Sequence, residues 1–109
     1  MVQNIPTEAP RWIASYEHLA ETLSEGYDMC IFEYTNDISG REMLERHKDH
    51  QIVAQMATRI AAADEKLRAI LLPTKRCIHG DFPRSHFWYW MYPANSPQLE
   101  SDLREINAI

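Results

Sequence analysis

The sequence predicts an α+β fold in which a small, mostly antiparallel sheet of about three strands packs against three to five helices. The helices are expected to form a single layer around one long central helix. Apolar residues recur at spacings of three and four over Asp49–Leu72, which is typical of a helix. Two shorter segments near the chain ends share this periodicity. Short runs rich in aromatic and β-branched residues, bounded by turn residues or proline, are typical of strands.

The overall composition indicates one acidic domain. A chain of 109 residues has the usual size of a single domain, so we expect one compact unit over 1–109, with residues 1–6 loose. The net charge of −5 argues against general binding to nucleic acid or to an anionic membrane, both of which need a basic surface. The sequence contains neither a membrane-span-length apolar run nor the pattern of a secretory signal. We therefore expect a cytoplasmic location.

The two cysteines are expected to be buried thiols, because disulfides are rare in the cytoplasm. A Cys30–Cys77 disulfide remains the alternative if the elements that carry these residues pair.

The first helix is expected to begin near Thr7 or Pro10, since proline is tolerated in a first turn. Gly26 is placed to end it in a left-handed conformation. The next segment, Tyr27–Tyr34, has strand propensity and leads into turn residues. The apolar stripe of the first helix consists of Trp12, Tyr16, Leu19 and Leu23.

A second helix is expected to begin at Ser39, because Ser39 and Glu42 match a capping box. Its apolar pattern does not continue into the long helix. A break near His47–Asp49, with Asp49 as a second cap, is therefore expected, although one continuous helix over Ser39–Leu72 remains open. Pro73 ends the long helix. The stripe of the long helix is Val53, Met56, Ile60, Ala63, Leu67 and Ile70.

The C-terminal third predicts a β-hairpin followed by a helix. Lys75–His79 and His86–Tyr92 are the expected strands, joined by the turn residues 80–85. Asn95 and Ser96 precede a helix with Pro97 at its first position. The stripe of this last helix is Leu99, Leu103 and Ile106.

Side chains alternate along a strand, so the second hairpin strand would show large groups on both faces. Two interpretations are open: both faces lie in the core, or one face is an exposed aromatic patch that binds a partner. The face that would be exposed consists of His86, Trp88, Trp90 and Tyr92, and the opposite face consists of Phe87, Tyr89 and Met91.

Our leading functional hypothesis is a non-enzymatic interaction module of the physical type of inhibitors, immunity proteins and antitoxins. An acidic chain gains association rate and specificity against a basic protein partner. Basic residues lie beside the aromatic run, so a surface that binds single-stranded nucleic acid is a weaker alternative. A homodimer through the long helix also remains open. No cofactor, metal or catalytic residue is assigned under this hypothesis. The expected binding surface is Arg84, His86, Trp88, Trp90 and Tyr92.

The alternative hypothesis is a small ligand- or metal-binding domain, or an enzyme, that uses His79, Asp81 and His86. These side chains flank one loop and could converge, although a zinc site needs three or four ligands. The segment Ile78–Phe82 locally resembles the catalytic loop of aminoglycoside phosphotransferase-like kinases. That loop has a metal-binding Asn five residues after its aspartate, where this chain has His86. Without that Asn and without a Gly-rich phosphate loop, Gly80 and Asp81 are expected to form a turn.

Overall fold

Helix α1 (Ile5–Thr22) begins two residues before Thr7, the earlier of the two expected starts, so Ile5 and Pro6 are helical rather than loose, and Pro6 lies in the first turn. The structure, a computed structural model, describes residues 4–109. The predicted stripe is confirmed, since Tyr16, Leu19 and Leu23 are buried and Trp12 is partly buried. The 3-10 turn η1 (Leu23–Glu25) follows, and Gly26 ends it with a φ of 109°. Glycine reaches this positive φ without the steric cost that other residues meet there.

The prediction of a strand over Tyr27–Tyr34 is wrong. Helix α2 (Ile31–Arg46) begins inside this segment. The backbone N–H of Ile31 donates to the Asp102 carboxylate at 2.9 Å, so a residue distant in sequence satisfies the first turn of the helix. The predicted start at Ser39 is also wrong, because Ser39 lies inside α2. Glu42, expected to complete a capping box, is instead buried.

The break between α2 and the following helices is confirmed, but its cap is His50 rather than Asp49. The His50 Nδ1 accepts a hydrogen bond from the Ile52 N–H at 3.2 Å. The long helix expected over Asp49–Leu72 is divided into α3 (Gln51–Ala54) and α4 (Ala57–Ile70). Its stripe nevertheless faces inward: four members are buried, namely Val53, Met56, Ala63 and Leu67, and Ile60 and Ile70 are partly buried.

The sheet within residues 4–109 is a two-stranded antiparallel ribbon rather than about three strands. Strand β1 (Leu71–Pro73) pairs with β2 (Met91–Pro93), and Leu72 lies opposite Tyr92. The predicted hairpin is wrong: residues 75–79 form a loop, and η2 (Phe87–Tyr89) is a 3-10 turn. All three η2 side chains are buried, which the alternation of a strand with one solvent face would not allow.

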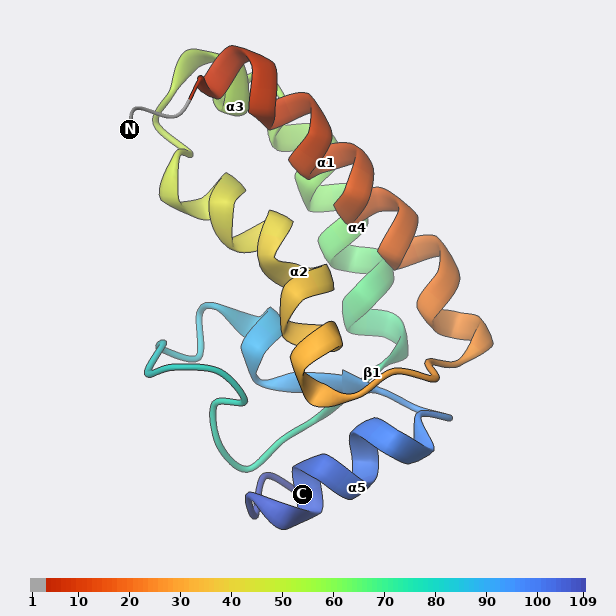
Figure 1. Ribbon diagram of the computed structural model, residues 1–109. Helices are drawn as coiled ribbons and strands as arrows, with labels where there is room; N and C mark the ends of the chain where they lie inside the picture. The colour runs from red at the N-terminus through yellow and green to blue at the C-terminus, as the bar shows by residue number, and fades with distance from the viewer. Residues whose placement is uncertain (1–3) are drawn as a thin grey trace.

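Helix α5 (Pro97–Glu105) is confirmed, with Ser96 as N-cap and Leu99 and Leu103 buried. Figure 1 shows α1, α2 and α4 packed together in the upper part of the molecule and α5 near the lower end of α2. The ribbon lies between this bundle and α5. The result is a small single-domain α+β fold. None of the helices in residues 4–109 combines the length and apolarity needed to cross a membrane.

Candidate functional site

Helix α2 places two charged residues side by side in the interior of the protein. Arg41 is 8% exposed and Glu42 is 4% exposed. Charged side chains are almost never buried to this extent unless they are paired. Their partners come from the other parts of the fold, and together they form a buried polar network of Tyr16, Arg41, Glu42, Asp64, His86 and Trp88.

The Arg41 half of the network joins α1, α2 and α4. The Arg41 guanidinium donates to both oxygens of the Asp64 carboxylate, at 2.8 and 3.0 Å. The Tyr16 hydroxyl donates to the same carboxylate, and the guanidinium lies 4.1 Å from the centre of the Trp88 ring. Burial by itself lowers the pKa of Arg41, but its hydrogen bonds and the charge of Asp64 raise that pKa overall. The guanidinium therefore stays charged in the interior.

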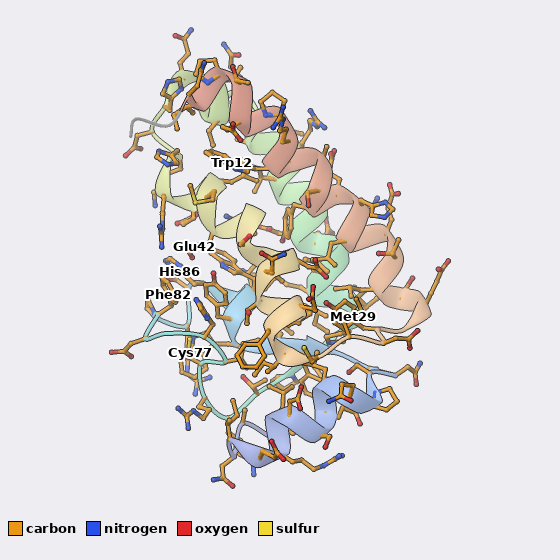
Figure 2. The ribbon with its side chains drawn as sticks, in the orientation of Figure 1. Trp12, Met29, Glu42, Cys77, Phe82 and His86 are labelled. Carbon is orange, nitrogen blue, oxygen red and sulfur yellow. The ribbon has the colours of Figure 1, made fainter. Side chains whose placement is uncertain are left out.

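The Glu42 half of the network joins α2 to the segment around η2. Glu42 Oε1 lies 2.8 Å from His86 Nδ1 and accepts from Trp88 Nε1 at 3.3 Å. Figure 2 shows Glu42 and His86 next to each other, with Phe82 beside them. The His86 ring stacks on Phe82 at 5.2 Å. A carboxylate that orients an imidazole is a common element of metal-binding and catalytic sites, but such sites also need a further ligand or a nucleophile.

The other residues of the alternative hypothesis do not complete such a site. His79 is exposed, and its ring is tilted against that of Tyr89 with the ring centres 5.4 Å apart; Asp81 is also exposed. Across residues 4–109, no group of three or more His, Cys, Asp and Glu side chains is placed to hold a metal ion. Both cysteines carry free, partly buried thiols, and the Cys77 thiol donates to the His79 carbonyl at 3.1 Å.

The expected aromatic surface is present only in part. Trp88 is 1% exposed, so it belongs to the core, and the prediction that it shares an exposed face with Trp90 is wrong. Trp90 is half-buried, and the Arg84 guanidinium lies 4.3 Å from its ring centre. Tyr92 is also half-buried and lies opposite Leu72, which is 42% exposed. We call these four residues the Trp90 surface: Leu72, Arg84, Trp90 and Tyr92.

The orientation of Trp90 is fixed by its own backbone surroundings. Its indole N–H lies 3.1 Å from the Phe82 carbonyl oxygen and 3.2 Å from that of Pro83, so it donates to this pair of acceptors. The Thr74 N–H donates to the Trp90 carbonyl and extends the ribbon by one hydrogen bond. The ring is therefore held in place before any partner is present.

Sequence reasoning missed the buried network because it placed the start of α2 too late. Once the helix begins at Ile31, Ile38 and Arg41 are three residues apart and Ile38 and Glu42 are four apart, which puts all of them on the buried side with Tyr34. The sequence signal for the network was the presence of two charged residues, Arg41 and Glu42, on an otherwise apolar side of this helix.

Comparison with known proteins gives no match: no family model fits the chain, and neither the curated proteins nor the solved structures give a significant similarity. Function is therefore inferred from the geometry described above.

Proposed function

We propose that this protein is a non-enzymatic interaction module that binds a partner protein through the Trp90 surface. Its physical type is that of a small inhibitor, immunity protein or antitoxin. The observation that carries the proposal is the Arg84–Trp90 pair, whose indole orientation is set by the Phe82 and Pro83 carbonyls. Trp, Tyr and Arg are enriched among the residues that dominate interface energies. An anchor that is already ordered loses less entropy on binding.

The test compares variants of this pair with a matched pair elsewhere in the fold. Arg68 lies 4.3 Å from the ring centre of Phe87, so Arg68→Ala removes an equivalent Arg–aromatic contact away from the Trp90 surface. Affinity capture from the native host's lysate should recover a stoichiometric partner with the wild type and with Arg68→Ala. Arg84→Ala and Trp90→Ala should lose it while keeping the wild-type circular dichroism spectrum. A partner retained by all variants, or no partner with any, contradicts the proposal.

Trp88 is not a suitable probe of this surface. Its ring is fully buried between Arg41 and Phe87, so Trp88→Ala is expected to cost about 3–5 kcal/mol of unfolding free energy. A loss of binding in that variant would report unfolding rather than contact with a partner.

The second candidate function is a small ligand-binding domain or enzyme in which His86 acts with His79 and Asp81. One observation favours it: the buried Glu42 carboxylate holds the His86 imidazole at 2.8 Å. Under this proposal, purified protein carries a stoichiometric ligand or metal that His86→Gln removes and Asp49→Asn, an exposed change elsewhere, leaves in place. Protein that carries neither contradicts this candidate.

A further inference from the structure

Two large apolar side chains at the start of α2 lie in solvent. Met29 is 49% exposed and Phe32 is 80% exposed. Single exposed apolar residues are common, so exposure alone indicates nothing. The residues that follow Phe32 by one turn and two turns on the same side of α2 are polar and uncharged, namely Asn36 and Ser39, and both are exposed. This side of α2 is therefore open beyond Phe32.

The segment of chain that contains these two residues carries acidic residues equal in number to the whole net charge of the protein. The segment from Leu19 to Gly40 contains five acidic residues and no Lys, Arg or His. The remaining eleven acidic residues equal in number the eleven Lys and Arg residues of the rest of the chain, which gives the net charge of −5. The five acidic residues of the segment are Glu21, Glu25, Asp28, Glu33 and Asp37.

Two of these acids form a ridge along α2, on the side of the helix next to the one that carries Phe32. Glu33 and Asp37 are four residues apart on α2, where like charges repel each other by a few tenths of a kcal/mol in an isolated helix. The Tyr27 hydroxyl donates to Asp37 Oδ2 at 2.6 Å, and both acids raise the pKa of Tyr27, after the larger effect of burial. The ridge is therefore a locally unfavourable concentration of charge that a cation would relieve.

A hollow lies next to this ridge, between the end of α1 and α2. Its volume is about 230 Å³, and Asp37 and Tyr27 line one side of it. The other lining residues come from α1: Ser15, His18, Leu19 and Thr22. The wall thus offers a carboxylate and hydroxyls, which suit the head group of a Lys or Arg side chain.

We infer that Met29, Phe32, Glu33 and Asp37 form a docking surface for a basic protein segment. An apolar side chain of that segment packs on Met29 and Phe32, and a Lys or Arg side chain binds at Asp37 beside the hollow. Charge complementarity selects this occupant, because a nucleic acid, an anionic membrane or the same acidic surface of a second copy would be repelled. The inference rests on the proposed interaction role but uses a different surface. Figure 2 shows Met29 and Phe82 on opposite sides of the lower part of α2.

The probe is a library of random linear peptides displayed on phage and selected on the full chain. We expect the selected peptides to carry net positive charge and at least one aromatic or large aliphatic residue. Phe32→Ser and Glu33→Lys should each weaken binding by about tenfold or more, which is the range of interface anchors. Both side chains are exposed, so both variants should stay folded, and Glu33→Lys should lose at most about 1 kcal/mol because Glu33 lies in the first turn of α2. Leu72→Ser and Glu65→Lys are the matched controls, an exposed apolar residue and an exposed acid elsewhere, and should bind as the wild type does.

Several outcomes overturn the inference. These are neutral or acidic selected peptides, equal binding to Phe32→Ser and wild type, no selected peptide at all, or a chain that self-associates through Phe32 in light scattering. Peptides whose binding depends on Trp90 but not on Phe32 overturn this inference and leave the proposed function standing. Basic peptides that need Phe32, together with no partner for the Trp90 surface, support this site and refute the other.

Discussion

Glu42 is a buried acid whose position in the interior depends on its hydrogen-bond partners. It contributes one carboxylate to the interior, and that carboxylate accepts from Trp88 Nε1 and lies against His86 Nδ1. Arg46 Nε donates to the other carboxylate oxygen, Glu42 Oε2, at 3.4 Å. A buried donor that loses its acceptor costs more than the hydrogen bond itself contributes. The free energy of unfolding should therefore fall when Glu42 alone is replaced.

Glu42→Ala should lower the free energy of unfolding by about 2–3 kcal/mol, because the Trp88 indole N–H loses its acceptor in the core. Glu42→Gln keeps an acceptor oxygen and should cost roughly 1 kcal/mol less. Urea unfolding followed by tryptophan fluorescence measures both changes. Glu65→Ala, at an exposed position of α4, serves as the control. A Glu42→Ala variant as stable as this control would show that Trp88 does not depend on Glu42.

At the scale of elements, α2 begins where another element satisfies its first N–H. The Asp102 carboxylate of α5 accepts from Ile31 at 2.9 Å, in the role that an N-cap side chain usually has. Asp102→Ala should therefore lower the free energy of unfolding by about 1 kcal/mol and speed hydrogen exchange of the Ile31 amide. Asp102→Asn retains an acceptor and should lose less. Unchanged exchange at Ile31 in Asp102→Ala would show that the carboxylate does not cap α2.

Gly40 lies at the contact between α2 and α1. A Cβ at Gly40 would lie 3.1 Å from the Trp12 carbonyl oxygen, and that oxygen is backbone that can move only with its helix. Gly40→Val should therefore cost about 2 kcal/mol through overpacking. Asn36→Val places the same side chain at an exposed position of the same helix and should stay within about 0.5 kcal/mol of wild type. Thermal or urea unfolding separates the two, and equal losses would contradict a close helix crossing.

The elements that were predicted correctly are those whose signals are local. The stripes of α1, of the α3–α4 segment and of α5 follow from spacing within one stretch of chain. The start of α2 depends on Asp102, which lies 71 residues away, so no local pattern reveals it. Of the candidate site, strand alternation places Trp88 and Trp90 on one face, whereas the structure buries Trp88 and leaves Trp90 partly exposed. The burial of Trp88 was one of two open interpretations, since it depends on Arg41 and Glu42 facing it.

At the scale of the whole molecule, tyrosines from distant segments share one interior. Tyr16 on α1, Tyr34 on α2 and Tyr89 in η2 are all buried, as is Tyr27 in the loop before α2. Burial is the largest cause that raises each of their pKa values, and that of Tyr89 rises to about 12. Among the described residues, the buried Tyr34 hydroxyl has no hydrogen-bond partner. The folded state therefore resists ionisation of phenols throughout the core.

This resistance predicts a loss of stability in base. Below about pH 10 the phenols are protonated in both states, so their contribution to stability is fully present. As the pH rises above about 10, the unfolded chain releases these protons and the folded chain does not, so the free energy of unfolding falls. The decline becomes less steep near pH 12, where Tyr89 ionises in the folded state, and continues because Tyr16, Tyr27 and Tyr34 are still protonated there. Urea unfolding over this range should show the decline, and Tyr89→Phe should make it less steep.

Phenolate absorbance tests the same core directly. At about pH 11 the folded protein should show much less phenolate than the same chain in urea, because four of its five tyrosines have raised pKa values. Circular dichroism recorded on the same samples identifies the pH range in which the chain is still folded. Equal phenolate signals from folded and unfolded chains at that pH would mean that these phenols face solvent. The packing of α1, α2 and η2 around one interior would then be refuted, and with it the assignment of Trp88 to the core and of Trp90 to the surface.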